Sequence, residues 1–309
     1  MKCGYVAILG RPNVGKSTLM NHLLGQKIAI TSRKPQTTRH NLLGIDTVGE
    51  VQALYVDTPG IHETQGARAI NRYMVRTAAS VLQDVDLLLF LIEQGRWTDE
   101  DQLVLDMLAR VGKPLIAVIT KIDQLARRED LLPIIADLRE RHDFAEIFPI
   151  AALRGDGVDE LRTLVGRYLP AAPHLFEADQ ITDRSERFLV AEVIREKLMR
   201  RLGEELPHQT TVVIESFARR DASGPTASER ADEGLVDIAA LIYVERAGQR
   251  QIVIGRKGER LKAIGQDARK DIQTLIGCKV MLRLWVKVRP GWTDDERSLS
   301  QLGYDDRSA

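Results

Sequence analysis

Apolar residues in the first half of the chain gather in short runs, and helical spacing fills most of the segments between them. Six runs have the length and composition of strands: Tyr5–Leu9, Asn41–Thr47, Ala53–Val56, Leu87–Ile92, Leu115–Thr120 and Glu146–Ile150. Alternating strands and helices predict an α/β domain with a mainly parallel sheet, which binds ligands at the carboxyl ends of its strands. Because a short turn region, Val48-Gly49-Glu50, joins the second run to the third, we expect a hairpin whose first strand is an antiparallel edge.

The alternation of strands and helices ends near Leu169-Pro170-Ala171-Ala172-Pro173, where two prolines bracket small residues. We therefore divide the chain into a first domain, 1–170, a linker, 171–184, and a smaller α+β domain with a C-terminal extension, 185–309. In the second domain we expect a first helix, Ser185–Leu202, and four strands, Thr211–Phe217, Leu235–Glu245, Gln251–Ile254 and Val280–Val288. A second helix with an apolar face from Leu261 to Leu275 is expected between the last two strands. The polar segment Arg219–Gly234 is expected to be a mobile loop.

Composition narrows the class of protein. The 309 residues carry no formal net charge, so only local charge can point to an anionic partner. Cys3 and Cys278 lie at opposite ends of the chain, which speaks against a disulfide framework or a zinc site. The first predicted strand leaves no room for a signal peptide, and no apolar run approaches the ~20 residues that cross a bilayer. We expect a cytoplasmic protein and leave peripheral contact with the inner face of the cell membrane open.

One stretch of the first domain, Gly10-Arg11-Pro12-Asn13-Val14-Gly15-Lys16-Ser17-Thr18, fits the phosphate-binding pattern GxxxxGK[ST] at every fixed position. It lies between a predicted strand and a predicted helix, so backbone N–H groups and the helix dipole would surround an anion. Lys16 supplies a positive charge for the β- and γ-phosphates, and Ser17 supplies a hydroxyl for Mg²⁺. We expect nucleotide contacts at Gly10, Asn13, Val14, Gly15, Lys16, Ser17 and Thr18.

Two further segments lie where the sheet would present them to the same ligand. Asp57-Thr58-Pro59-Gly60 follows a strand, so that Asp57 can hold Mg²⁺ through water and the Gly60 N–H can meet the γ-phosphate. The polar loop Thr31–His40 can change order with nucleotide state, with Thr38 as the first choice of Mg²⁺ ligand and Thr37 as the second. A simple turn and a solvated surface loop are the alternatives.

The segment Thr120-Lys121-Ile122-Asp123 closes another predicted strand. A carboxylate at Asp123 can accept hydrogen bonds from N1–H and the exocyclic amine of guanine. Adenine lacks that pair of donors, and a site built for them penalises a ligand without them. The stem of Lys121 can lie over the plane of the base. The segment therefore favours GTP over ATP, with a plain surface turn as the alternative.

In this order and spacing, the four segments resemble the P-loop GTPase superfamily, and Pro12-Asn13, Gln36-Thr37-Thr38-Arg39 and Asp57-Thr58-Pro59-Gly60 resemble its translation-associated branch. The resemblance implies hydrolysis of GTP to GDP and phosphate, with Mg²⁺ held by Ser17, Thr38 and Asp57. It also implies that Asn13 assists Lys16 in catalysis by holding K⁺ beside the phosphates, where a cation would stabilise charge on the leaving oxygen.

Three positions depart from the family pattern. Thr120 stands where members usually carry asparagine, which we expect to weaken guanine affinity without removing selectivity. Ala151 replaces a serine, although Ala151, Ala152 and Leu153 still offer a backbone N–H to the guanine O6. Ile61 stands where Ras-like members carry the glutamine that orients the attacking water, so we expect slow unaided hydrolysis.

The second domain contains a GxxG loop, Gly255-Arg256-Lys257-Gly258, at the start of a helical pattern. This arrangement resembles a KH domain, in which such a loop grips the backbone of a few unpaired nucleotides. Arg256, Lys257 and Lys262 would supply charge beside Gly255 and Gly258. Between Arg246 and Arg289, twelve basic residues stand against three acidic ones, which favours a polyanion, with a solvated charged face as the alternative.

A GTPase domain of this branch followed by a KH domain resembles the Era family of bacterial ribosome-assembly GTPases. The resemblance extends to Ile181-Thr182-Asp183-Arg184-Ser185, Trp285-Val286-Lys287-Val288 and Gly291-Trp292-Thr293-Asp294. It implies a monomeric switch that binds the 3′ region of small-subunit ribosomal RNA and assists assembly and maturation of the small ribosomal subunit. Two alternatives stay open: a non-enzymatic RNA-binding protein with a structural nucleotide pocket, and a GTPase acting in RNA modification or at the membrane.

Overall fold

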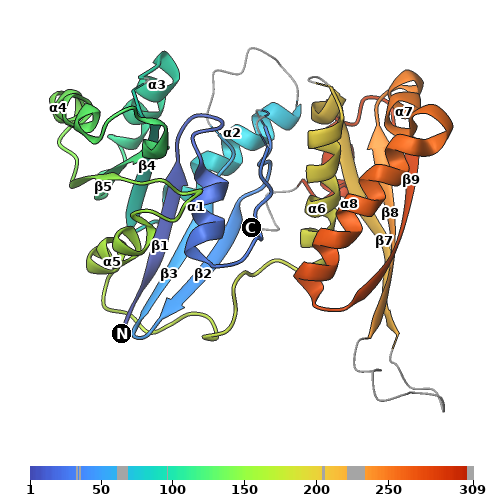
Figure 1. Cartoon of the computed structure of the whole chain (residues 1–309), viewed down its shortest axis with the longest axis horizontal. Coiled ribbons are helices and arrows are strands. Elements are labelled where there is room, and N and C mark those ends of the chain that lie inside the picture. The colour runs from blue at the N-terminus through green and yellow to red at the C-terminus, as the bar shows by residue number, and fades with distance from the viewer. Residues whose placement is uncertain are drawn as a thin grey trace. The chain divides into compact units, whose positions relative to one another are not determined.

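The computed structural model describes residues 1–32, 34, 36–60, 69–95, 97–203, 206–220 and 234–304. The chain forms two compact units that divide between Asp183 and Arg184 (Figure 1). The expectations for Ile61 and for most of the loop 219–234 lie outside the described residues. Within them, no helix combines the length and the apolar character needed to cross a membrane.

The first unit is built on a six-stranded sheet with the order β2-β3-β1-β4-β5-β6. Its strands are β1 (Lys2–Leu9), β2 (Leu42–Val48), β3 (Val51–Asp57), β4 (Leu87–Glu93), β5 (Leu115–Thr120) and β6 (Glu146–Pro149). Only the β2–β3 pair is antiparallel among these strand pairs, which confirms the predicted hairpin and its edge strand. Ile8 pairs with Asp57, so β1 and β3 deliver the phosphate loop and Asp57 to the same end of the sheet.

Helices cover both faces of this sheet: α1 (Lys16–Leu23), α2 (Ala69–Val81), α3 (Asp99–Leu108), α4 (Leu131–Arg141) and α5 (Val158–Tyr168). Apolar residues of α3 and α4, with Val81 and Leu82 at the end of α2, pack on β1, β4 and β5. The helices α1 and α5 contact each other and β3 (Figure 1). Short 3₁₀ turns, Ile122–Gln124 and Arg128–Asp130, follow β5.

The segment after α5 runs along the exposed edge of β2. The Ile45 N–H donates to the Ile181 carbonyl at 2.9 Å, and Thr182 Oγ1 donates to the Leu43 carbonyl at 2.6 Å. The buried side chain of Gln52 bonds the backbone of this segment three times: its Oε1 accepts from the N–H groups of residues 175 and 176, and its Nε2 donates to the carbonyl of residue 176. Residues 175–182 are therefore packed against the first unit.

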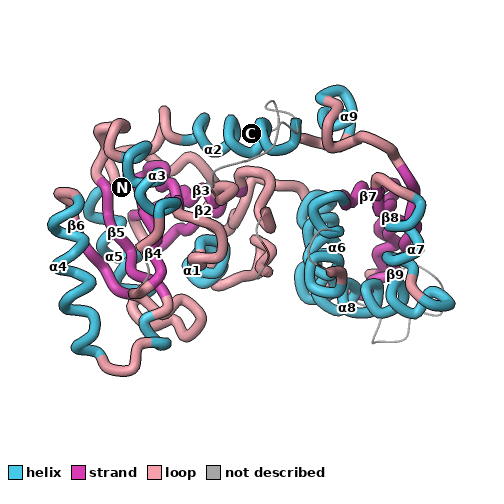
Figure 2. The backbone as a smooth tube through the Cα atoms, turned by 90° about the horizontal axis from the view of Figure 1, so that it is seen from above, coloured by secondary structure: helices cyan, strands magenta, loops and turns pink. Residues whose placement is uncertain are grey.

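The second unit contains a three-stranded sheet of β7 (Thr210–Arg220), β8 (Leu235–Val244) and β9 (Lys279–Val288), in that order. β7 and β8 are antiparallel, while β8 and β9 are parallel. Figure 2 shows α6 (Glu186–Arg201), α7 (Ala247–Ile254) and α8 (Glu259–Ile276) beside this sheet. Apolar residues of these helices and of all three strands form one core. A 3₁₀ turn, Leu206–Gln209, precedes β7, and α9 (Glu296–Gln301) follows β9.

The prediction of a strand at Gln251–Ile254 is wrong, because these residues form the end of α7. The Ile-Val-Ile sequence favours a strand in isolation. A helix start overrides it: the N–H groups of Glu245 and Arg246 both donate to Gln249 Oε1 at 2.9 Å. Val253 is fully buried, whereas Ile252 stays 44% exposed, as on a one-sided helix.

Candidate nucleotide site and nucleic-acid groove

The phosphate loop joins β1 to α1 and needs unusual backbone angles. Gly10, Asn13 and Gly15 have φ values of 150°, 66° and 110°. A Cβ atom at Gly10 would lie 2.6 Å from the Leu91 carbonyl oxygen, so this position excludes side chains. Lys16 Nζ donates to the carbonyls of Gly10 and Arg11 at 2.9 and 3.0 Å. Burial lowers the pKa of Lys16 to about 8, although the charge of Asp57 opposes that shift.

Three oxygen-bearing side chains that the sequence predicts as metal ligands meet beside this loop. Ser17 Oγ lies 2.6 Å from Asp57 Oδ2 and 3.1 Å from Thr38 Oγ1. Thr38 Oγ1 lies 3.4 Å from the same carboxylate oxygen. The other oxygen, Asp57 Oδ1, is buried and has no hydrogen-bond partner among the residues that the structure describes. Burial raises the pKa of Asp57, against the lowering effect of Lys16 and of the two hydroxyls.

A pocket extends from the phosphate loop to the loop before β2. Its walls carry Pro12, Asn13, Gly15, Lys16, Ser17, Thr18, Ile30, Thr31, Ser32, Lys34, Gln36, Thr37, Thr38 and Gly60. A Cβ atom at Gly60 would lie 3.0 Å from the Pro12 backbone nitrogen, so the segment after β3 closes on the phosphate loop. Thr37 Oγ1 donates to the Lys34 carbonyl at 2.6 Å, while Thr38 reaches the Asp57 carboxylate.

The predicted base-binding residues lie at the ends of β5 and β6. Thr120 is buried, and its hydroxyl donates to the Val14 carbonyl at 2.8 Å, with the Ile92 carbonyl at 3.3 Å. Val14 belongs to the phosphate loop, so Thr120 links the two loops directly. Asp123 Oδ2 lies 3.6 Å from Arg154 Nε in the loop after β6.

That loop after β6 is a tight turn. The Ala151 N–H donates to the Asp156 carbonyl at 3.0 Å, and the Ala151 carbonyl accepts from the N–H groups of Arg154 and Gly155. Since the Ala151 N–H is already bonded, Ala152 and Leu153 are the remaining positions from which the predicted backbone donor to guanine can come. Ala152 is buried and Leu153 is 78% exposed.

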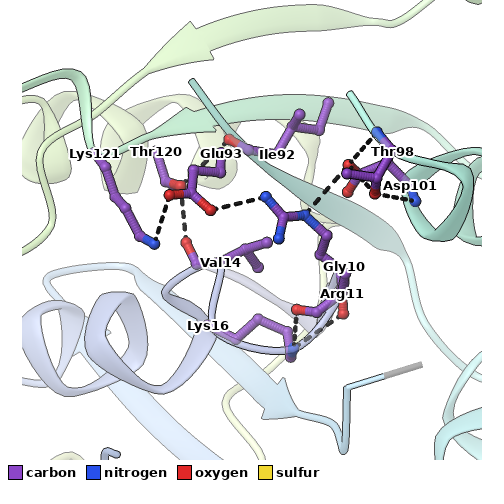
Figure 3. A network of polar contacts seen from close by, with 10 residues as sticks. All are labelled: Gly10, Arg11, Val14, Lys16, Ile92, Glu93, Thr98, Asp101, Thr120 and Lys121. Carbon is purple, nitrogen blue, oxygen red and sulfur yellow. Dashed lines mark hydrogen bonds and ion pairs between the residues drawn. The ribbon is translucent and has the colours of Figure 1, made fainter. Parts of the chain in front are cut away.

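Sequence reasoning missed a chain of charges beside these loops (Figure 3). Glu93, at the end of β4, pairs through Oε2 with Arg11 Nη2 at 2.8 Å and through Oε1 with Lys121 Nζ at 3.0 Å. Arg11 Nε also lies 3.3 Å from the buried carboxylate of Asp101. Burial alone would raise the pKa of Glu93, but Lys121 and Arg11 outweigh it and lower the value. The signal in the sequence was the position of Glu93, an acidic residue at the carboxyl end of a predicted strand.

The GxxG loop of the second unit lies between α7 and α8. Gly255, Lys257 and Gly258 have φ values of 73°, 51° and 80°, and the side chains of Arg256 and Lys257 are exposed. The groove beside the loop is walled by α8 and β9, through Gly258, Leu261, Lys262, Gly265, Gln266, Arg269, Leu282 and Leu284. The predicted residue Lys262 therefore lies beside the apolar side chains of the groove. Such a groove suits a single-stranded nucleic acid, because its bases can pack on apolar residues while its phosphates face a basic side chain.

Comparisons with known proteins agree with a GTPase domain in the first unit and a KH domain in the second. A family model described as 50S ribosome-binding GTPase matches residues 5–121, and a KH domain model matches residues 205–293. GTPase Era of Ectopseudomonas mendocina is 57% identical over 303 residues, covering 98% of this chain and 97% of that relative. GTPase Era of Azotobacter vinelandii is 56% identical over 306 residues, covering 99% of this chain and 98% of that relative.

Two solved structures share the whole fold. A tyrosine-to-alanine variant of Aquifex aeolicus Era, bound to GDP and AlF4⁻, has a TM-score of 0.91 and 40% identity, with 98% of this chain and 99% of that chain covered. Era in complex with MgGDPNP and nucleotides 1506–1542 of 16S ribosomal RNA has the same TM-score and coverage at 39% identity. This chain, a P-loop GTPase domain followed by a KH domain, is a GTPase and belongs to the Era family.

Proposed function

We propose that this GTPase is a molecular switch that binds the 3′ region of small-subunit ribosomal RNA in its KH groove and assists small-subunit assembly and maturation. The observation that carries the proposal is the groove beside Gly255–Gly258, with an apolar floor and basic rim in a chain that also holds a phosphate loop. The relative that is 39% identical binds MgGDPNP and a 16S ribosomal RNA fragment.

Within this proposal, the nucleotide phosphates lie on the loop from Gly10 to Thr18, where backbone N–H groups and Lys16 meet their charge. Asp123 accepts hydrogen bonds from the guanine edge, and the stem of Lys121 lies over the base. A backbone N–H of Ala152 or Leu153 donates to the guanine O6. Thr120 acts through its bond to the Val14 carbonyl rather than through the base.

The cluster of Ser17, Thr38 and Asp57 fits Mg²⁺, because it offers hard oxygen ligands and the buried Asp57 Oδ1 lacks a hydrogen-bond partner within the described part of the chain. When bound, Mg²⁺ neutralises charge on the β- and γ-phosphate oxygens. Asn13 lines the same pocket with a left-handed backbone, and we extend the proposal to a K⁺ ion held by its side-chain oxygen.

Hydrolysis then requires attack of water on the γ-phosphate. Lys16 and the loop N–H groups stabilise the negative charge that develops on the phosphate oxygens. The position after Gly60 carries isoleucine, which cannot orient the water through a hydrogen bond, so the unaided rate is low.

In the RNA groove, Gly255 and Gly258 let a phosphodiester approach the backbone, and Arg256, Lys257 and Lys262 supply charge. Leu261, Leu282 and Leu284 supply the apolar surface against which bases pack.

The test is the affinity for a short single-stranded RNA copying the ribosomal 3′ end, measured at fixed salt with a non-hydrolysable GTP analogue and with GDP. We expect tighter binding with the analogue and weaker binding of a scrambled RNA. Equal binding in both states would refute nucleotide control of RNA affinity. Equal binding of the scrambled RNA would refute sequence-specific recognition of the ribosomal 3′ end.

A further inference from the structure

A chain of four charged side chains joins the phosphate loop to the predicted guanine loop. Asp101 pairs with Arg11, Arg11 pairs with Glu93, and Glu93 pairs with Lys121 (Figure 3). Arg11 belongs to the phosphate loop, and Lys121 belongs to the loop after β5. Because each Glu93 oxygen faces a different cation, one carboxylate connects the two loops.

The sheet order explains why Glu93 can do this. β4 lies between β1, which leads into the phosphate loop, and β5, which leads into the guanine loop. Glu93 is the last residue of β4 and pairs in register with Thr120, the last residue of β5. The residue at this position therefore lies between the two loops at the carboxyl edge of the sheet.

The charges of this chain are largely shielded from solvent, which strengthens the Coulomb attraction within each pair and also adds a cost for removing the charges from water. The side chains of Glu93 and Arg11 are 16% and 15% exposed, and that of Asp101 is fully buried. Asp101 is itself fixed at the start of α3, since its Oδ2 accepts from the Thr98 N–H at 3.0 Å and the Thr98 hydroxyl at 2.9 Å. One end of the charge chain is thus anchored in a helix cap.

The other end of the chain is Lys121, which has a left-handed backbone with φ of 58°. Its Nζ is held 3.0 Å from Glu93 Oε1, so the direction of its four-carbon stem is constrained at both ends. A stem held in place loses less conformational entropy when a base packs on it.

Thr120 makes this link more important in this chain. A threonine hydroxyl has one proton to donate, and here it serves the Val14 carbonyl at 2.8 Å. An asparagine amide, which related GTPases usually carry there, has two donor hydrogens and an acceptor oxygen. The threonine therefore offers fewer bonds between the loops, and the Arg11–Glu93–Lys121 pairs add a second connection.

We propose that Glu93 is a positioning residue of the nucleotide site, which holds Lys121 for guanine stacking and shares with Thr120 the task of joining the guanine loop to the phosphate loop. This inference rests on the proposed guanine site at Lys121 and Asp123.

The test uses the full-length protein and the dissociation rate of a fluorescent GDP in Mg²⁺ buffer. Glu93→Gln keeps the side-chain size and removes the charge, and we expect GDP to dissociate about tenfold faster. Glu50→Gln is the matched control, because Glu50 lies in the β2–β3 turn with its side chain 86% exposed. We expect no change for Glu50→Gln.

Two further variants separate positioning from plain stability. In the Glu93→Gln background, Thr120→Asn should reverse at least half of the increase in the GDP dissociation rate on a logarithmic scale, because it restores bonds between the loops. The effects of Glu93→Gln and Lys121→Met should be less than additive, since both remove the same pair. The inference is overturned if Glu93→Gln releases GDP at the rate of Glu50→Gln, or if it lowers only the melting temperature of the nucleotide-free protein.

A last comparison separates this inference from the proposed site. Asp123→Asn should change the preference between GDP and xanthosine diphosphate (XDP). Glu93→Gln should instead weaken the binding of both nucleotides equally. An unchanged preference in Asp123→Asn would overturn the guanine site itself. If Asp123→Asn changes the preference and Glu93→Gln binds both nucleotides as the wild type does, only the role of Glu93 is overturned.

Discussion

The phosphate loop of the first unit and the GxxG loop of the second unit use similar backbones in different surroundings. Each has three residues with positive φ, and each ends in a glycine at the N-cap of a helix, α1 or α8. A glycine cap has no side chain to bond the first N–H groups of the helix, so these donors stay available to a phosphate. The backbone at the start of the helix is thus similar in both units.

The surroundings decide what each loop can hold. Lys16 is 6% exposed and its amine is bonded to the loop itself, whereas Arg256 and Lys257 are exposed to solvent. The phosphate loop is further fixed by the Arg11–Glu93 pair and by Thr120. An enclosed loop suits one phosphate chain of defined length, and an open loop suits a polymer that continues past it on both sides.

The largest expected effect comes from Lys16→Ala. We expect GTP hydrolysis to fall by about 10²–10³, because a preorganised charge at the developing phosphate charge is lost. Lys257→Ala is the matched control and should hydrolyse GTP at the wild-type rate. Single-turnover hydrolysis with radiolabelled GTP measures both. Activity of Lys16→Ala within threefold of wild type would contradict the enclosed-site interpretation.

A pair of glycine substitutions compares how tightly the phosphate loop and the GxxG loop are packed by their surroundings. Gly10→Ala should destabilise the first unit by about 3 kcal/mol, because its Cβ would meet the Leu91 carbonyl at 2.6 Å on a strained backbone. Gly258→Ala should cost the second unit about 1 kcal/mol, from its left-handed backbone alone, since its Cβ would meet no atom within 4 Å. Native-state hydrogen exchange, read separately for peptides of each unit, measures both. Equal costs would show that the two loops are equally enclosed.

The smallest expected effect is electrostatic. The double variant Arg256→Ala and Lys257→Ala should weaken single-stranded RNA binding about tenfold and flatten the slope of log affinity against log salt by about 1.4, at about 0.7 per phosphate contact. Fluorescence anisotropy at four salt concentrations gives the slope. Lys279→Ala, on the edge strand β9, serves as a control for general loss of positive charge. An unchanged slope in the double variant would place the phosphate contacts elsewhere.

Much of this architecture could be predicted because its signals are local. The strands of the first sheet are apolar runs, and the sequence predicts all six to within a few residues. The predicted metal ligands follow from motifs next to the phosphate loop, and the structure brings Ser17, Thr38 and Asp57 together. The helix α7 was missed because its Ile-Val-Ile sequence suits a strand, while the cap that starts the helix depends on a single side chain, that of Gln249.

The charge chain could not be predicted from local pattern. Arg11 and Glu93 are far apart along the chain, and they meet only because β4 lies beside β1 in the sheet. Strand order depends on the packing of the whole domain, so pairs of this kind become visible only once the sheet is assembled. The sequence offered one indication, which is that Glu93 is an acidic residue at the carboxyl end of a predicted strand.

The segment 175–182 has a consequence beyond its role as a connection. An uncovered edge strand presents unpaired N–H and C=O groups that can template pairing with another chain. Here Ile181 and Thr182 bond to β2, and Gln52 fastens the preceding residues. A GTPase fragment ending at Pro170 would therefore gain an aggregation-prone edge, whereas a fragment that retains Thr182 keeps the edge protected.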